Sequence, residues 1–331
     1  MNYPWFNRYF SELKQTLASH IRETKRERFS YNYLMSTFPD YVEPLFRPPS
    51  EADSLIFQVT NGCSWNRCAF CDMYTAPQKK FRIKKEADIF LEIERASRSG
   101  VPVRRIFLAD GDAMVLSTRR LLAILDQINR HFPDLNRVSS YCLPRNVQHK
   151  SVSELAELKD AGLSLLYIGA ESGDDEVLAL IDKGETFTST VDALQKIQQA
   201  GIKSSVMILN GLGGDLFSRQ HVLNSARLAN ETQPDYLATL VLSFPLGKER
   251  FLCKFPKNFN LLDQAGLIRE MQQFIEHVEL KRTIFRSDHA SNYLVLKGVL
   301  NKDKQRLLDM LHLAIHSPEE ISLRQEWQRS L

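Results

Sequence analysis

A regular alternation between short apolar runs and amphipathic segments, from residue 54 to residue 244, limits the fold more than any other feature. Short, continuous apolar runs between turn residues are typical of strands covered on both faces. The segments between them repeat their apolar residues with a helical period, and several close on a glycine, as at Gly100 and Gly162. This alternation predicts a parallel sheet with right-handed crossovers. The expected strands are residues 54–60, 104–110, 136–143, 163–170, 202–209 and 235–244.

An open doubly wound sheet and a barrel both satisfy this alternation, and periodicity alone does not choose between them. Residues 4–38 are helix-like, and their basic run "RETKRER" is interpreted as a solvated helix face. Paired prolines at 48 and 49 end that pattern. The chain after residue 247 is less regular, with amphipathic helices expected at 261–278 and 303–316 and no barrel-like repeat between them. We therefore divide the chain into residues 1–50, 51–247 and 248–331.

The composition, 43% hydrophobic and 25% charged over 331 residues, supplies ample apolar side chains for a large core. The net charge of +3 is too small to indicate a nucleic-acid or membrane partner, and no recognisable RNA-binding module supports one. No apolar run of about 18 residues occurs, so we expect no membrane span. Charges early in the chain argue against a signal peptide. Five cysteines, an odd number, argue against a disulfide framework and predict a cytoplasmic location.

Three of the five cysteines, Cys63, Cys68 and Cys71, fall within "NGCSWNRCAFCDMY" directly after the first expected strand. Loops at the carboxyl ends of strands are where α/β folds place their active sites. Three thiolates suit a soft metal or an iron–sulfur cluster. A structural zinc site usually has four ligands, and Cys142 and Cys253 are isolated in the sequence, although a Cys₃His zinc site stays open. A four-iron cluster held by three cysteines would leave one iron free to bind a small molecule.

The cysteine spacing resembles the signature of the radical S-adenosylmethionine (SAM) superfamily. The sequence Cys63-x₄-Cys68-Ala69-Phe70-Cys71 matches the second half of that signature and is one residue longer in its first gap. The resemblance runs through about residues 53–247 and is greatest to the oxygen-independent coproporphyrinogen oxidase and methylthiotransferase branches. Four further segments follow in the order expected for those branches: "LADGDAM" (108–114), "YIGAESGDDEVLALIDKG" (167–184), "ILNGLGGD" (208–215) and "SFPLGK" (243–248).

The resemblance implies an α/β fold in which residues 51–247 form a partial (β/α)₆ TIM-like barrel. An N-terminal helical segment precedes it, and a C-terminal α/β extension is expected to cap the substrate end. It also implies a [4Fe-4S] cluster on Cys63, Cys68 and Cys71, with SAM bound to the open iron. Further SAM-binding residues implied by position are Phe70, Asp110, Gly111, Asp112, Glu171, Ser172, Lys183 and Asn210.

Six of these eight residues also have a structural interpretation. Phe70, expected near the adenine, is equally explained as core filling. Asp110 and Asp112, expected to accept from the SAM ammonium, would otherwise cap a helix, as would Glu171 and Ser172. Lys183, expected to pair with the SAM carboxylate, would otherwise be a solvated helix-end lysine.

By the same resemblance, the chain is expected to be an oxygen-sensitive enzyme that reductively cleaves SAM. The resulting 5′-deoxyadenosyl radical would take hydrogen from an unidentified small or medium-sized substrate. A one-electron reductant such as flavodoxin or ferredoxin would supply the electron. His289, in the polar segment "SDHASNY", is a candidate proton donor or acceptor, with a structural hydrogen-bonded corner as the alternative.

Two departures from the coproporphyrinogen oxidase branch argue against a porphyrin substrate. Tyr141 stands where that branch commonly has an acid, and Met207 stands where an aspartate often lies near the SAM ribose. Two other functions stay open for the whole chain. One is a non-catalytic, cluster-bearing haem or metal chaperone, and the other is a zinc-stabilised scaffold.

Overall fold

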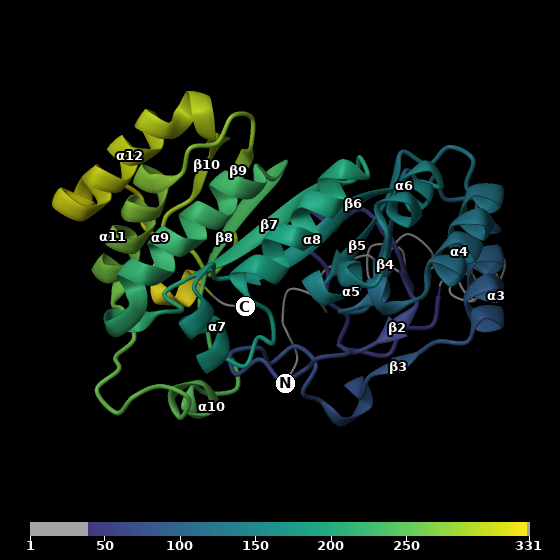
Figure 1. Ribbon diagram of the computed structural model, residues 1–331, viewed down its shortest axis with the longest axis horizontal. Helices are drawn as coiled ribbons and strands as arrows, with labels where there is room; N and C mark the ends of the chain where they lie inside the picture. Colours follow the sequence, from purple (N-terminus) through teal and green to yellow (C-terminus); the bar gives the residue numbers. More distant parts are fainter. Residues whose placement is uncertain (1–38, 330–331) are drawn as a thin grey trace, which may run out of the picture.

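An eight-stranded sheet organises residues 39–329, the part of the chain that this computed structural model describes (Figure 1). The N-terminal helical segment predicted at residues 4–38 lies outside the described residues. The strands follow one another across the sheet in chain order. They are β1 (Leu55–Gln58), β4 (Arg105–Ala109), β5 (Arg137–Cys142), β6 (Leu163–Glu171), β7 (Lys203–Asn210), β8 (Tyr236–Val241), β9 (Ile284–Ser287) and β10 (Leu296–Val299).

All pairs from β1 to β9 are parallel, and β10 alone runs antiparallel, to β9. The six predicted strands are therefore confirmed, and so is the mixed α/β class with a partial barrel. β9 and β10 are additional strands, from a segment in which the sequence showed no barrel-like repeat. Each has only four residues, and β9 alternates exposed with buried positions, so neither gives the continuous apolar signal of a buried strand.

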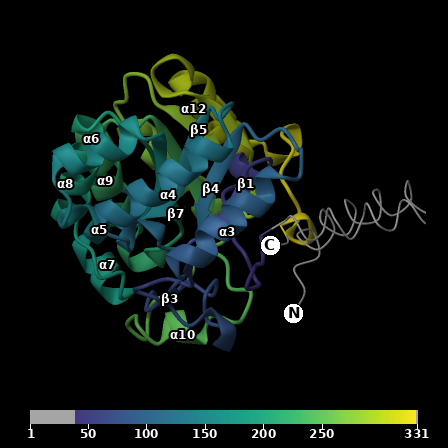
Figure 2. The same cartoon turned by 90° about the vertical axis from the view of Figure 1, so that its right-hand side faces the viewer.

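Helices cover one face of the sheet, as Figures 1 and 2 show together. Their starts follow from capping: Ser117 accepts from the amide of Arg120, and Ser151 forms a capping box with Glu154. Within residues 39–329, no helix combines the length and the apolar composition that crossing a membrane requires. The helices are α3 (Glu86–Ser97), α4 (Thr118–His131), α5 (Pro144–Gln148), α6 (Val152–Asp160), α7 (Asp175–Leu180), α8 (Phe187–Gln199), α9 (Gly214–Thr232), α10 (Glu249–Leu252), α11 (Gln264–His277) and α12 (Leu300–His316).

The two faces of the sheet differ in burial, because side chains alternate along each strand. Toward the helices, the strands pack a continuous apolar core that includes Phe57, Val206 and Phe285, each fully buried. The opposite side chains, which we call the inner face, are only partly covered on β7 and β8 and are exposed on β9. This alternation makes the inner face the open wall of the partial barrel.

A buried carboxylate closes the amino ends of the first strands. Glu51 lies in a short 3₁₀ turn (η1, Pro49–Glu51) and is fully buried. Its Oε1 accepts from Arg137 Nη2 at 2.6 Å and from the Tyr167 hydroxyl at 2.6 Å. Its Oε2 accepts from the hydroxyl of Ser54. These bonds fix η1 against β5 and β6 on the amino side of the barrel. The predicted site lies in the loops at the carboxyl end.

Candidate cofactor site at the cysteine loop

The cysteine loop begins at a glycine that no other residue could replace without strain. It follows β1 and is framed by a small antiparallel hairpin of β2 (Thr60–Asn61) and β3 (Arg82–Ile83). Gly62 has φ +72°, and a Cβ atom there would lie 2.0 Å from the carbonyl oxygen of Lys79. Its amide donates to Asp110 Oδ2 at 3.1 Å. The first residue of the loop is thus tied to the end of β4.

The long first gap of the cysteine motif is a packed turn. Asn66 adopts φ +43°, and its side-chain amide donates to the carbonyl of Tyr74 at 2.9 Å. The indole N–H of Trp65 donates to the carbonyl of Asp182 at 2.7 Å. The guanidinium of Arg145 stacks on the Trp65 ring, 3.9 Å from its centroid. Trp65 therefore anchors the four-residue gap to α5 and to the turn after α7.

The three thiols of the loop are half-buried and electrostatically coupled. Burial raises the pKa of Cys63, raises the pKa of Cys68 to about 11 and raises that of Cys71 to about 12. A charged Cys63 raises the pKa of Cys68, and charge on Cys68 and Cys63 raises the pKa of Cys71. Lys183 acts in the opposite direction and lowers the pKa of Cys63 and Cys68. Across residues 39–329, no three metal-binding side chains lie close enough together to hold one metal ion.

Asp110, at the end of β4, is fully buried, and only one of its oxygens has partners. Its Oδ2 forms an ion pair with the equally buried Lys79 and accepts from Gln58 Nε2 at 3.1 Å. Its Oδ1 is buried without a hydrogen-bond partner among the described residues. Burial raises the pKa of this carboxyl, although Lys79 opposes the shift. Next to it, Gly111 lets the Tyr74 ring approach, since a Cβ there would lie 2.4 Å from that ring.

Asp112 repeats this arrangement two residues later. Its Oδ2 accepts from the hydroxyl of Ser64, next to Cys63, and its Oδ1 is buried without a partner in the described part of the chain. Burial raises the pKa of Asp112 to about 6, against the lowering effect of the Ser64 hydrogen bond.

Glu171 and Lys183 form a buried ion pair at the end of β6. Glu171 Oε1 lies 3.0 Å from Lys183 Nζ, and Glu171 Oε2 is buried without a partner among the described atoms. Gly169 makes room for this carboxylate, because a Cβ there would lie 2.1 Å from Glu171 Oε1. Burial works against the charge of Lys183, but Glu171 and then Cys68 raise the pKa of its ammonium above the usual value. Lys183 is thus not the solvated helix-end lysine of the alternative interpretation.

Together these residues place three thiols, one ammonium and three buried, unpartnered carboxylate oxygens at the carboxyl ends of β1, β4 and β6. A buried polar atom without a partner costs roughly 1–3 kcal/mol, so a group of three such oxygens calls for a water, an ion or a ligand that completes them. Thiolates are iron ligands, and carboxylate oxygens accept from an ammonium or a hydroxyl. The donor set therefore fits an iron–sulfur cluster with an amino-acid-like ligand beside it.

Three predicted residues make contacts within the protein, two through hydrogen bonds and one through apolar packing. The Ser172 hydroxyl bonds to His221 Nδ1 at 2.8 Å and accepts from the Asp174 amide at 3.0 Å. The side chain of Asn210 donates to the carbonyl of Leu267 in α11 at 3.1 Å. Phe70 packs against an apolar cluster that includes Leu178. Contacts of these side chains with SAM stay predictions.

His289 lies in a hydrogen-bonded corner directly after β9. Its Nδ1 accepts from the amide of Ser291 at 3.2 Å, and its carbonyl accepts from Arg324 Nη1 at 2.6 Å. Burial lowers the pKa of this imidazole, and Arg324 lowers it further. These contacts match the structural interpretation, while a proton-transfer role stays a prediction.

Several side chains that hold the loop were not predicted. Arg250 Nη2 donates to the carbonyl of Cys71 at 2.6 Å and bonds Asp72 Oδ1 at 2.7 Å. Lys79 also donates to the carbonyl of Val42 at 2.8 Å, so it joins three separate segments. Among the side chains that hold the loop, Trp65 was the one with a sequence signal, because it is an aromatic residue inside a polar loop.

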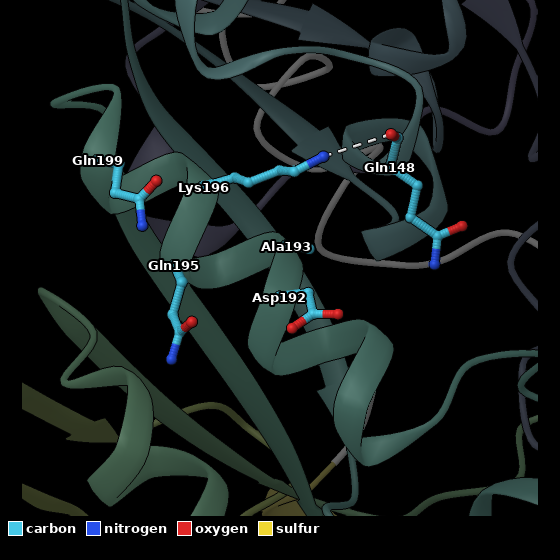
Figure 3. Close-up of a pocket in the computed structure, with 6 residues that line it drawn as sticks. All are labelled: Gln148, Asp192, Ala193, Gln195, Lys196 and Gln199. Atoms are coloured by element: carbon cyan, nitrogen blue, oxygen red, sulfur yellow. Dashed lines mark hydrogen bonds between the residues drawn. The ribbon is translucent and has the colours of Figure 1, made fainter.

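Two surface hollows of the described chain lie away from this site. One of about 270 Å³ is lined by α8 and by Gln148 of α5, where Lys196 donates to the Gln148 carbonyl at 3.4 Å (Figure 3). Another, of about 380 Å³, lies between Tyr293 and the segment from Pro318 to Glu326. Neither includes a predicted site residue.

The comparisons with known protein sequences agree on one protein family. The model of the "Radical SAM superfamily" matches residues 57–227. The heme chaperone HemW of Bacillus subtilis is 24% identical over 168 residues, which are 48% of this chain and 43% of that protein. A putative methylthiotransferase of Methanocaldococcus jannaschii is 25% identical over 181 residues, 50% of this chain and 38% of that protein. The chain thus spans about two fifths of the length of these relatives.

Among solved structures, coproporphyrinogen III oxidase (HemN) from Escherichia coli superimposes with a TM-score of 0.53. The match covers 74% of this chain and 54% of that one, at 16% sequence identity. At that identity the likeness concerns the fold alone.

Proposed function

Because the chain belongs to the radical SAM superfamily, we propose that it is an enzyme that cleaves SAM reductively and removes hydrogen from a substrate. The superfamily uses a [4Fe-4S] cluster and SAM, so these are the cofactors. In the proposal, Cys63, Cys68 and Cys71 hold three irons of the cluster. The fourth iron is left for the amino and carboxylate groups of SAM. When bound, the cofactors supply cleavage of SAM by one electron to methionine and 5′-deoxyadenosine, with a hydrogen atom taken from the substrate.

One observation carries the proposal: Asp110 Oδ1, Asp112 Oδ1 and Glu171 Oε2 are buried and unpartnered beside the thiols. In the proposal these oxygens accept hydrogen bonds from the ammonium and hydroxyl groups of SAM. The other oxygen of each residue is already fixed, by Lys79, Ser64 and Lys183 respectively. The acceptors are therefore held in place before the ligand arrives, which lowers the entropic cost of binding.

The charge of Lys183 has a second role in this proposal. It lowers the pKa of Cys63 and Cys68, two of the three thiols that must lose protons to bind iron. The positive charge of Lys183 would also stabilise the negative charge of an assembled cluster and of a bound carboxylate.

Aromatic side chains below the site would keep water from the reacting atoms. The rings of Phe107 and Tyr141 meet edge to face with centroids 5.1 Å apart, and those of Tyr141 and Tyr167 are 6.2 Å apart. Tyr167 is fixed from below by Glu51. In the proposal, these three rings separate the reaction space from Glu51 on the amino side of the barrel.

Three further features belong to the proposal. The substrate is small or medium-sized and lies against the inner face, with residues 248–331 capping that end of the barrel. A one-electron donor such as flavodoxin or ferredoxin reduces the cluster. The protein works in the cytoplasm and loses its cluster in oxygen.

A second candidate function, a cluster-bearing chaperone for haem or a metal, is favoured by the similarity to the heme chaperone of Bacillus subtilis. The half-exposed inner-face residues Tyr236 and Met207 would offer a flat apolar ligand a partly apolar surface on that wall. This candidate keeps the cluster and omits substrate turnover.

Anaerobic reconstitution separates these functions. After loading with iron and sulfide, the protein is reduced with dithionite in the presence of SAM, and 5′-deoxyadenosine is quantified by chromatography. The proposed enzyme contains about four irons per chain and forms deoxyadenosine. Iron and stoichiometric haem binding without deoxyadenosine would favour the chaperone. One zinc per chain and no iron after the same treatment would contradict both.

A further inference from the structure

The inner face of the last four strands is basic. β7, β8, β9 and β10 contain Lys203, Arg286 and Lys297 and no acidic residue. Alternation places all three cations on the inner face, opposite the helix-covered side chains Ser204, Phe285 and Leu296. The wall of the partial barrel that faces the proposed reaction space therefore carries net positive charge.

Arg286 and Lys297 stand directly opposite each other in the antiparallel pair of β9 and β10. Like charges at such a position destabilise a sheet. The charge of Lys297 is offset by Asp288 Oδ2 at 2.8 Å. Arg286 is exposed and forms no ion pair or side-chain hydrogen bond with another described residue, so its guanidinium is available to a ligand.

The strand register connects Arg286 to the candidate cofactor site. Arg286 pairs with Ala238, Ala238 with Met207, and Met207 with Gly169. Gly169 lies directly below the Glu171 carboxylate. Strands in a sheet are about 4.8 Å apart, so this row spans about 14 Å, and two of its four members, Gly169 and Ala238, are small. That length matches one small or medium-sized molecule extending from the cofactor end to Arg286.

We propose that Arg286 binds an anionic group, a carboxylate or a phosphate, of the substrate whose other end lies over Gly169. The planar guanidinium can donate two parallel hydrogen bonds to either group, which fixes orientation as well as position. The identity of Arg286 as a substrate residue rests on the proposed function, because it takes the inner face to be the reaction space.

Equilibrium dialysis of the anaerobically reconstituted protein tests this inference without turnover. The probe is a defined mixture in which each carboxylic acid is accompanied by its primary amide, and each phosphate monoester by its parent alcohol. Arg286→Gln is compared with Arg227→Gln, an exposed α9 arginine that pairs with Glu231 on the helix-covered side. Thermal unfolding of both variants confirms that each is folded.

We expect the wild type to retain carboxylates or phosphates roughly tenfold or more over their neutral counterparts. Arg286→Gln should lose this preference and Arg227→Gln should keep it; the two series show which anion is recognised. Equal retention of charged and neutral probes, no retention of any anion, or an unchanged preference in Arg286→Gln overturns the inference. Anion preference without deoxyadenosine formation would contradict the proposed function alone, and deoxyadenosine formation without anion preference would contradict this inference alone.

Discussion

The guanidinium of Arg145 lies 3.9 Å from the centroid of the Trp65 ring, and so couples α5 to the long first gap of the cysteine motif. Arg145 also bonds Glu185 Oε1 at 2.8 Å, and Gly184 lies so close that a Cβ there would be 2.3 Å from the indole. Trp65, the second of the four residues in the gap, thus belongs to a packed junction between two loops.

Replacing Trp65 with alanine should loosen the cysteine loop. The change removes a cation–π contact and an indole hydrogen bond, together worth about 1–3 kcal/mol. We expect a modest fall in thermal stability and faster bleaching of the reconstituted cluster in air, followed at 400 nm. Trp65→Phe keeps a ring and should lie between the two; bleaching of the alanine variant at the wild-type rate would remove the assigned role of this junction.

Replacing Cys68 with alanine should abolish the cluster. Cys68 is one of three thiols that share a half-buried loop, and a cluster with two protein ligands is not expected to persist. Iron and sulfide content after anaerobic reconstitution measure the effect. Cys253→Ala is the matched control, because Cys253 is exposed on the segment after α10. A full cluster in Cys68→Ala, or its loss in Cys253→Ala, would contradict the ligand assignment.

Gly62 and Gly100 form a matched pair for testing the entry to the loop. Their φ angles are +72° and +71°, but a Cβ at Gly100 meets nothing within 4 Å, whereas one at Gly62 would lie 2.0 Å from a backbone oxygen. Gly100→Ala should cost about 1–2 kcal/mol in unfolding free energy from its backbone conformation alone. Gly62→Ala should cost several kcal/mol and prevent cluster assembly. Urea unfolding of both apoproteins measures this, and equal losses would rule out the close approach.

Replacing Lys183 with methionine should strongly destabilise the apoprotein. The change leaves the Glu171 carboxylate buried without its counter-charge, which costs roughly 3–5 kcal/mol. Adding Glu171→Gln should recover much of the loss, because it removes the isolated charge. Lys159→Met is the control: Lys159 forms an exposed pair with Asp160, and its loss should cost less than about 1 kcal/mol. A small effect of Lys183→Met in urea unfolding would mean that the pair is not buried in solution.

Glu270 should make the stability of the protein depend on pH. Burial raises the pKa of this α11 carboxyl from 4.5 to about 7, although Ser218 and the Gly211 amide donate to it. The pKa of Glu270 is higher in the folded protein than in the unfolded chain. The stabilisation that this carboxyl contributes is therefore complete below about pH 4.5 and is lost as the pH rises through about 7.

Glu270→Gln should therefore be more stable than the wild type at pH 8, by at most on the order of 3 kcal/mol, and the difference should disappear near pH 4. Unfolding of the apoprotein across this range measures the effect. Glu276→Gln, an exposed position on the same helix, should show no such dependence. A constant difference between wild type and Glu270→Gln at all pH values would exclude this titration.

Local sequence signals predicted the six parallel strands because each is a continuous apolar run that must be buried on the helix side. The boundaries were close: β6 was expected at 163–170 and spans Leu163–Glu171. β9 was not predictable in this way. Its four residues join the sheet through pairing with Tyr236 to Ala238, and local periodicity carries no information on such a long-range contact.

The same distinction applies to the site. The cysteine motif was recognised from its spacing, and the acids at 110, 112 and 171 were predicted from the family resemblance of the segments that contain them. The partners that fix those acids come from distant segments: Gln58 bonds Asp110 across 52 positions, and Ser64 bonds Asp112 across 48. Only the folded sheet brings the end of β1 beside the end of β4, so residues such as Lys79 had no recognisable sequence signature.

The buried carboxylate of Glu51 also has a consequence for how such a protein can change. Its bonds to Arg137 and Tyr167 tie the η1 turn to the start of β5 and to the middle of β6 without involving any loop at the carboxyl end. Substitutions, insertions or exchanges in the loops after β7, β8 and β9 therefore leave this connection intact. Directed evolution of those loops can alter which molecules are accepted while the scaffold keeps its tolerance to mutation.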